Sequence, residues 1–178
     1  GEGPVFLYVG RVAVEKNIEA FLRTDLPGKK VVVGSGPQFA ELRVKYPDVT
    51  FTGKQIGEDL AECYASADVF VMPSQTETFG IVLLEAMASG LPVAAYPVTG
   101  PLDLVRQAET GFLSEDLAAA AKAAMSLDRD IIRKRALDYS WEAAARLFIA
   151  NIETALFARL GQGTPKRRVT LARPASSA

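Results

Sequence analysis

The chain has 178 residues, 49% of them apolar and 23% charged, which fits one globular domain with a substantial buried core. Twenty basic residues against twenty-one acidic ones leave a net charge of -1, so no overall field recruits nucleic acid or an anionic membrane. No apolar run approaches the ~20 residues of a membrane-spanning helix, and the absence of histidine excludes the Ser/His/Asp and Cys/His catalytic triads.

The chain begins at Gly1, with neither an initiator methionine nor a charged segment followed by an apolar one. We therefore expect no signal peptide and interpret the chain as a piece of a longer protein. Cys63 is the only cysteine, which excludes an internal disulfide and, without histidine, a structural zinc site. A reducing, cytoplasmic environment is the expected location, and no bound metal is expected.

Short apolar runs alternate with helical patterns along the first part of the chain. The runs lie at 5–9, 30–33, 49–52, 68–72 and 92–96, and the helical patterns at 17–23, 38–46, 58–66, 79–89 and 101–107. Short apolar runs between helices are typical of strands buried on both faces, as in a parallel sheet joined by right-handed crossovers. The predicted fold class is therefore α/β, a Rossmann-like doubly wound parallel sheet of about five to six strands with C-terminal helices.

Beyond Ser114 only helical patterns follow, at 117–125, 129–139 and 141–160, so we expect the sheet to end before them. We predict one domain over residues 1–160. The segment 161–178 is rich in glycine, proline, serine and basic residues and has little to bury, which predicts a disordered basic tail. Its cations could contact anionic lipid, but a solvated terminus is the favoured interpretation.

The strands of a parallel sheet all point their carboxyl ends to one edge, and ligands bind in the crevice outside those ends. The loops expected there are 10–16, 34–37, 53–55, 73–80 and 99–101. Arg11 and Lys16 supply cations, and the helix that starts near Phe79 supplies free backbone amides. This edge therefore suits a phosphate or diphosphate.

Each of these signals is weak alone. Gly34-Ser-Gly36 lacks the third glycine of a dinucleotide-binding fingerprint, and the sequence has no Gly-x-x-x-x-Gly-Lys-Ser/Thr loop. Arg11 and Lys16 taken singly would be interpreted as solvated turn residues. Because five loops deliver glycine, hydroxyl or charge to one edge, an anion site is the favoured interpretation, and dinucleotide oxidoreductases and P-loop enzymes lose support.

Two glutamates, Glu77 and Glu85, have seven residues between them. Glu85 lies among apolar residues, so we expect it on a largely buried helix, where its carboxylate needs either an internal network or the hydroxyl groups of a ligand. Glu77 precedes this helix, where an acid would ordinarily interact with the helix dipole for ~0.3–1 kcal/mol. Its spacing from Glu85 favours a binding role instead.

Four segments form a recognisable set. They are Gly10-Arg11 to Lys16-Asn17, Gly34-Ser-Gly-Pro37, Ala67-Asp-Val-Phe-Val-Met-Pro-Ser74 and Glu77-Thr-Phe-Gly-Ile-Val-Leu-Leu-Glu85-Ala-Met-Ala-Ser-Gly-Leu-Pro-Val93. Together they resemble the C-terminal, donor-binding domain of retaining GT-B glycosyltransferases of the "group 1" family, which are family 4-like. The resemblance runs from about Val5 to Leu160 and implies one half of a GT-B fold.

The resemblance implies three catalytic residues. Arg11 and Lys16 would hold the diphosphate of the donor, and Glu77 would contact the transferred sugar. The donor would be a nucleotide sugar such as a UDP- or GDP-sugar. No cofactor or metal is implied, because the two cations would stabilise the leaving nucleoside diphosphate.

The remaining donor-binding roles are also implied by the resemblance. Glu85 would bind the ribose hydroxyl groups, and Lys54 and Gln55 would lie beside the base. The backbone of four residues would contact sugar and phosphate: Phe79, Gly80, Ile81 and Val82.

The implied reaction moves a sugar, with retention at the anomeric carbon, to a glycan, lipid or small-molecule acceptor. An N-terminal Rossmann-like domain of the same enzyme would hold this acceptor, and lipid-modifying members of the family suggest association of the full enzyme with the inner face of a membrane. Two alternatives stay open. One is another GT-B activity, as half of an epimerase or a phosphorylase, and the other is a nucleotide-binding module without transfer activity.

Overall fold

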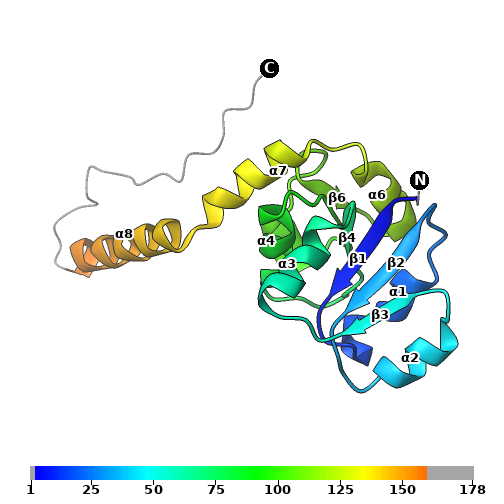
Figure 1. Cartoon of the computed structure of the whole chain (residues 1–178). Helices are drawn as coiled ribbons and strands as arrows, with labels where there is room; N and C mark the ends of the chain where they lie inside the picture. The colour runs from blue at the N-terminus through cyan, green and yellow to red at the C-terminus, as the bar shows by residue number, and fades with distance from the viewer. Residues whose placement is uncertain (1–2, 160–178) are drawn as a thin grey trace. The chain divides into compact units, whose positions relative to one another are not determined.

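The computed structural model describes residues 3–159, and the chain divides into two compact units between Leu137 and Asp138. The first unit contains a six-stranded sheet (Figure 1). Its strands are β1 (Val5–Val9), β2 (Lys29–Val33), β3 (Thr50–Gly53), β4 (Val69–Met72), β5 (Val93–Ala95) and β6 (Gly111–Leu113). They lie in the order β3-β2-β1-β4-β5-β6, and every neighbouring pair is parallel, which confirms the predicted fold class.

The apolar runs identified in the sequence overlap β1 to β5, and none of them falls on β6. This last strand has only three residues and begins with Gly111. A Cβ atom at that position would lie 2.2 Å from the carbonyl oxygen of Val93 on β5, so the close approach of the two strands requires glycine. The packing of β6 against β5 therefore requires glycine where a β-branched residue would have indicated a strand in the sequence.

The helices of the first unit all fall within the predicted helical patterns or within two residues of them. They are α1 (Ile18–Leu22), α2 (Phe39–Lys45), α3 (Gly57–Ala65), α4 (Ile81–Ala88), α5 (Thr99–Leu104), α6 (Leu117–Ala124) and α7 (Arg129–Ala136), with the 3-10 turn η1 (Val14–Lys16) before α1. Two aspartates fix helix starts: Asp116 accepts from the backbone N–H of Ala119, and Asp128 accepts from two N–H groups of α7.

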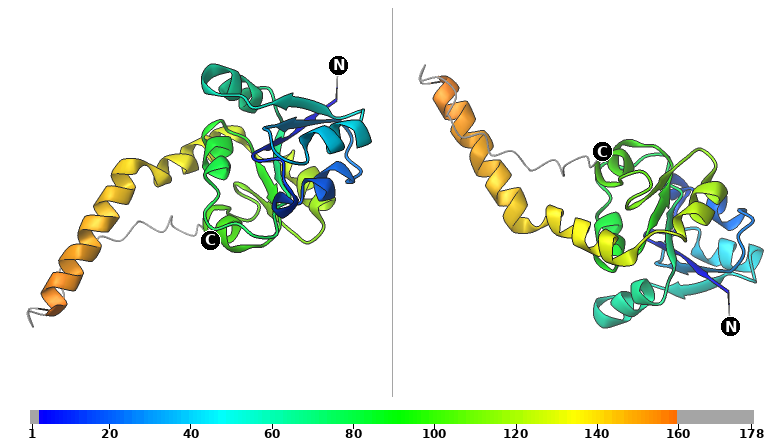
Figure 2. Two further views of the ribbon diagram at one scale, coloured as in Figure 1. Left: turned by 90° about the horizontal axis from the view of Figure 1, so that it is seen from below. Right: turned by 90° about the horizontal axis from the view of Figure 1, so that it is seen from above.

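Both faces of the sheet are covered by helices, as the views in Figure 2 show. Phe6, Val32 and Val71 point to one face and pack with residues of α1, α2 and α6 in a single hydrophobic cluster. Their neighbours in the strands point to the other face, where Phe70 contacts Tyr64 of α3. Burial on both faces explains why the strands are continuous apolar runs rather than alternating ones.

The second unit contains α8 (Trp141–Arg159), which confirms the long helix predicted there. Among the side chains of α8 that the structure describes, four large apolar ones are exposed: Phe148, Ile149, Ile152 and Leu156. The predicted disordered tail, 161–178, lies outside the described residues. Among the residues that the structure describes, no helix has both the length and the apolar character needed to cross a membrane.

Candidate functional site

The carboxyl ends of all six strands lie at one edge of the sheet, because every pair is parallel. From β1 the chain runs outward through β2 to β3, then returns to β4 on the other side of β1 and runs outward to β6. The loops after β1 and β4 therefore lead to opposite faces of the sheet and leave a crevice between them, which is where open α/β sheets bind ligands. Two neighbouring cavities lie along this edge.

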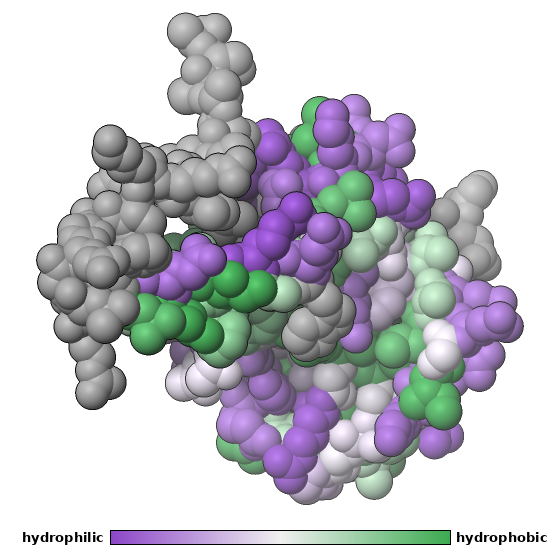
Figure 3. Space-filling model, turned by 90° about the vertical axis from the view of Figure 1, so that its left-hand side faces the viewer, coloured by the Kyte–Doolittle hydropathy of each residue, from purple (hydrophilic) through white to green (hydrophobic). Residues whose placement is uncertain are grey.

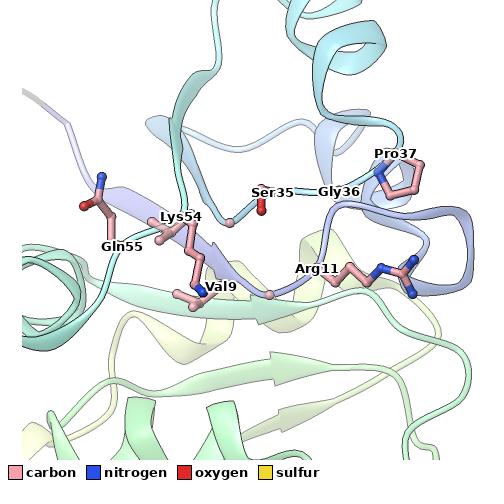
Figure 4. A pocket seen from close by; sticks show the side chains of 10 residues that line it. Val9, Arg11, Ser35, Gly36, Pro37, Lys54 and Gln55 are labelled. Carbon is pink, nitrogen blue, oxygen red and sulfur yellow. The ribbon is translucent and has the colours of Figure 1, made fainter.

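The first cavity has a volume of about 540 Å³ and lies outside the ends of β1, β2 and β3 (Figure 4). Its lining residues are Val9, Gly10, Arg11, Val33, Gly34, Ser35, Gly36, Pro37, Lys54 and Gln55. In Figure 4 the side chains of Lys54 and Arg11 stand on opposite sides of the Ser35 hydroxyl group. This cavity brings together three of the predicted site residues: Arg11, Lys54 and Gln55.

Backbone hydrogen bonds fix the shape of the first cavity. The N–H of Gly34 donates to the carbonyl of Gly53 at 2.8 Å, and the N–H of Gly10 donates to the carbonyl of Val33 at 3.0 Å. Gly34 has a φ of +138°, and a Cβ atom there would lie 1.8 Å from the carbonyl oxygen of Gly10. Only glycine fits this close approach of the loops after β1 and β2.

The second cavity has a volume of about 240 Å³ and lies between the ends of β1 and β4 and the start of α4. Its lining residues are Tyr8, Val9, Gly10, Arg11, Lys16, Met72, Ser74, Glu77, Gly80, Ile81 and Val82. The segment 9–11 lines both cavities, so the two are adjacent along the sheet edge. Six predicted site residues meet in this second cavity: Arg11, Lys16, Glu77, Gly80, Ile81 and Val82.

The closest charged contact in the second cavity joins Lys16 and Glu77. The Nζ atom of Lys16 donates to Oε2 of Glu77 at 2.8 Å, and the two side chains are 29% and 15% exposed. A pair this sheltered is screened less by water than a surface pair. The lysine cation therefore has a carboxylate partner within the cavity itself.

Asn17 links the two loops that carry this ion pair, which follow β1 and β4. It follows η1 with a left-handed backbone, φ +51°, and its Nδ2 atom donates to the carbonyl oxygen of Pro73 at 3.1 Å. The N–H of Gly100 donates to the carbonyl of Glu77 at 3.1 Å and fixes the other side of the loop after β4. Asparagine tolerates the left-handed region better than most residues, which explains its place at this turn.

The start of α4 supplies backbone donors to the second cavity. Gly80 is its N-cap residue, with φ +80°, and no side chain caps the helix. The first N–H groups of a helix have no acceptor within it, and the positive end of the helix dipole lies at the same place. The amides of Ile81 and Val82 are therefore suited to an anion.

Arg11 lies at the border between the two cavities. Its Nη1 atom donates to Oε1 of Glu15 at 3.1 Å, and the side chains of this pair are 63% and 53% exposed. Exposed pairs of this kind, four residues apart, contribute only about 0.3–0.5 kcal/mol. The guanidinium group can therefore turn toward a ligand at little cost.

Glu85 differs from its prediction, because its side chain is exposed rather than buried. Helix α4 buries Leu83, Ala86 and Met87, and Glu85 points away from them. The sequence around Glu85 is apolar on every side of the helix, and Ile81 is itself 59% exposed, so the pattern could not show which face is buried. The carboxylate accepts a hydrogen bond from the hydroxyl of Tyr64 at 2.8 Å, and within residues 3–159 neither a cation nor an amide is found as its partner.

Two predicted residues, Phe79 and Glu85, line neither of the two cavities. Phe79 is 51% exposed, and its carbonyl oxygen lies against Gly100. Glu85 stands four residues after Ile81 and so lies one turn further along the same side of α4.

Tyr8 lines the second cavity and was not among the predicted site residues. Its hydroxyl group donates to the carbonyl oxygen of Arg11 at 2.9 Å. Burial, with the charges of Glu77 and Glu15 as smaller causes, raises the pKa of Tyr8, so it remains a donor across the physiological range. As an aromatic residue inside a strand, it carried no signal that separates it from an ordinary core residue.

The face drawn in Figure 3 carries hydrophobic patches among hydrophilic ones. Within residues 3–159 no group of three or more His, Cys, Asp or Glu side chains could hold a metal ion. The charged residues that line the second cavity are two cations and one carboxylate, so the local charge favours an anion in a nearly neutral protein.

A family model described as "Glycosyl transferases group 1" matches residues 3–130. The chain is 38% identical to sulfoquinovosyl transferase SQD2 of Arabidopsis thaliana over 162 residues, which cover 80% of the chain and 32% of that relative. It is 44% identical to a GDP-mannose-dependent alpha-mannosyltransferase of Mycobacterium tuberculosis over 112 residues, or 62% of the chain and 30% of that relative. The chain thus spans about a third of the length of these relatives.

The fold is also similar to that of solved structures. Sucrose-phosphate synthase from Thermosynechococcus elongatus superimposes with a TM-score of 0.71 and is 34% identical. The matched region covers 88% of the chain and 46% of the synthase.

Proposed function

The chain belongs to the glycosyl transferases group 1 family, and from this membership we propose that it binds a nucleoside diphosphate sugar and donates its sugar to an acceptor with retention of anomeric configuration. The observation that carries the proposal is the second cavity. There a lysine cation, a carboxylate and the free amides of α4 meet at the switch point of the sheet. The donor class agrees with the name of the mannosyltransferase relative, which depends on GDP-mannose.

In this proposal the diphosphate lies in the second cavity. Lys16 and the amides of Ile81 and Val82 bind its oxygens, and Arg11 turns from Glu15 to the same group. These fixed donors stabilise the charge that develops on the leaving nucleoside diphosphate, which supplies the electrostatic part of catalysis without a metal or other cofactor. Glu77, beside Lys16, accepts from hydroxyl groups of the transferred sugar.

The two parts of the nucleoside, its base and its ribose, contact different residues. The base occupies the first cavity near Lys54 and Gln55, since this cavity shares the segment 9–11 with the second. The ribose reaches Glu85, because a ligand in contact with Ile81 needs only one helical turn to meet a residue four positions further. The donor therefore follows the sheet edge from the end of β3 to the start of α4.

We propose that a second Rossmann-like domain of the same enzyme binds the acceptor, which is a glycan, a lipid or a small molecule. The length of the relatives supports this part, since the chain spans 32% and 30% of the two described above. A cytoplasmic location, at the inner membrane face when the acceptor is a lipid, belongs to the same proposal.

Isothermal titration calorimetry tests the proposal directly. The folded chain is titrated with UDP, GDP and ADP, with the corresponding nucleotide sugars, and with a hexose 1-phosphate. We expect one base to bind in preference to the other two, and the sugar phosphate alone to bind weakly. The absence of heat with every nucleotide at millimolar concentration would contradict the proposal, and tight binding of the sugar phosphate alone would favour a phosphorylase.

A further inference from the structure

We infer that Tyr64 is a positioning residue that orients the Glu85 carboxylate toward the hydroxyl groups of a bound ribose. The inference rests on the proposed function, because it needs a nucleotide in the crevice. Tyr64 lies on α3 and Glu85 on α4, and 21 residues separate them in the chain. Neither the sequence pattern nor the resemblance assigns Tyr64 a role.

Tyr64 is held in one place by its own packing. The residue is 3% exposed, and the centroid of its ring lies 6.1 Å from that of Phe70 on β4, at an interplanar angle of 37°. Aromatic pairs at such a centroid distance stabilise the fold beyond the burial of their surface. The hydroxyl group is thus a fixed point at the surface of the core, from which it donates to Oε2 of Glu85 at 2.8 Å.

The hydroxyl group also remains a donor at physiological pH. Burial raises the pKa of Tyr64, and the hydrogen bond to Glu85 and its charge raise it further. Hydrogen bonds from a neutral donor to a carboxylate are stronger than bonds between two neutral groups. The bond therefore restrains a long, exposed side chain that would otherwise sample many rotamers.

The restraint leaves most of the Glu85 carboxylate available. An ionised carboxylate has about four lone-pair sites on its two oxygens. Among the described residues, the Tyr64 hydroxyl is the hydrogen-bond donor found for the side chain of Glu85, and it contacts Oε2 alone. The other oxygen is fixed in space and can accept from a ligand.

A second tyrosine–glutamate pair in the same unit shows the contrasting case. The hydroxyl of Tyr46 donates to Oε1 of Glu19, also at 2.8 Å. Glu19, however, already pairs with Arg23 and Lys45, and none of these residues lines either cavity. Glu19 belongs to a charge network with two cations, whereas the Glu85 carboxylate is held by the Tyr64 hydroxyl on a helix whose first residues line the second cavity.

The test compares Tyr64→Phe with Tyr46→Phe, each of which removes one hydroxyl group. Calorimetry measures the affinity of wild type and both variants for the preferred nucleoside diphosphate and for its 2′-deoxy and 3′-deoxy analogues. We expect Tyr64→Phe to lower the ribonucleotide-to-deoxynucleotide affinity ratio at least threefold, with the affinity for the deoxy analogues unchanged within twofold. Tyr46→Phe should leave the ratio at its wild-type value.

Three other results would separate a failure of the inference from a failure of the proposed function. A Tyr64→Phe variant whose affinities for all three ligands fall equally, or whose ratio stays unchanged, overturns the inference, because a purely structural role acts on every ligand alike. A wild type that binds the nucleotide but does not discriminate against the deoxy analogues overturns it as well, while the donor function stands. A wild type that binds no nucleotide contradicts the proposed function itself.

A second measurement avoids any loss of stability in Tyr64→Phe. With 3-fluorotyrosine incorporated, the fluorine signal of Tyr64 should shift when the ribonucleotide binds and shift less when the dideoxy analogue binds, whereas the signal of Tyr46 should not move with either. Equal shifts of the Tyr64 signal for both ligands would overturn the inference.

Discussion

The two cavities at the sheet edge are built in different ways. Backbone forms much of the first, where loops after three strands are joined by hydrogen bonds and Gly34 permits their closest approach. Side chains form more of the second, where Lys16 and Glu77 are paired and sheltered beside the backbone amides of α4. Since backbone contacts also belong to the folded core, substitutions in the first cavity should act mainly on stability. Substitutions in the second should act mainly on affinity, and the following predictions separate these effects.

The largest expected effect is on the stability of Gly34→Ala. The new Cβ atom would meet the carbonyl oxygen of Gly10 at 1.8 Å in a backbone conformation that alanine rarely adopts. We expect the free energy of unfolding to fall by about 3 kcal/mol or more, measured by urea denaturation. Gly53→Ala is the control, because φ there is +79° but no atom lies within 4 Å, so the expected loss is only about 1 kcal/mol. Equal losses would show that the loop contact does not define the cavity.

The next effect is on nucleotide affinity in Lys16→Met, which keeps an unbranched apolar stem but removes the cation. The Glu77 carboxylate then faces the diphosphate without its partner. Loss of a hydrogen bond to a charged group costs ~1.5–3 kcal/mol, so the affinity for nucleoside diphosphate should fall about 10- to 100-fold in calorimetry. Lys54→Met removes an exposed cation from the first cavity and should cause a much smaller loss. Similar losses in both variants would contradict the assignment of the diphosphate to the second cavity.

Glu77→Gln should have a smaller effect, and its size should differ between two ligands. The change removes the charge that opposes the diphosphate and releases Lys16 from its ion pair, so free nucleoside diphosphate should bind about three- to tenfold more tightly. The nucleotide sugar should gain less, because its hydroxyl groups lose a charged acceptor. Titration with both ligands gives the ratio. Weaker binding of the free diphosphate would show that the ion pair supports the anion site rather than competing with the ligand.

Glu15→Gln should have the smallest effect. It breaks the ion pair with Arg11, whose side chains are 63% and 53% exposed, and such pairs contribute little in water. We expect nucleotide affinity to change by less than twofold. The midpoint of thermal unfolding should change by about one degree. A larger gain in affinity would mean that Glu15 holds Arg11 away from the ligand more strongly than its exposure indicates.

Much of the fold could be predicted, because β1 to β5 are buried on both faces and therefore show as apolar runs. β6 could not, since its first residue must be glycine to approach Val93. The loops of the site followed from the parallel sheet alone. The contact of Lys16 with Glu77 spans 61 residues and depends on the Asn17 turn, which the sequence pattern does not reveal.

Side-chain orientation was the least predictable feature of the site. Helix α4 is apolar on all sides, so the exposure of Glu85 could not be derived from periodicity. Tyr64 and Tyr8 have the sequence context of ordinary core residues, and only their hydroxyl partners distinguish them. Hydrophobic patterns cannot identify residues that act through a hydrogen bond at the edge of the core. Such patterns indicate whether a side chain is buried, but not which group its polar end contacts.

The segment Val9–Gly10–Arg11 lines both cavities and is their common wall. A ligand bound in one cavity therefore restrains a segment that also lines the other cavity. When the two parts of a ligand are covalently linked, binding of the first part makes binding of the second part intramolecular. Pyrophosphate and nucleoside as separate fragments should each bind far more weakly than their joined form, beyond the sum of their free energies. The affinity of the site would then depend on the covalent link between phosphate and nucleoside as much as on their individual contacts. Free phosphates and nucleosides in the cell would bind only weakly.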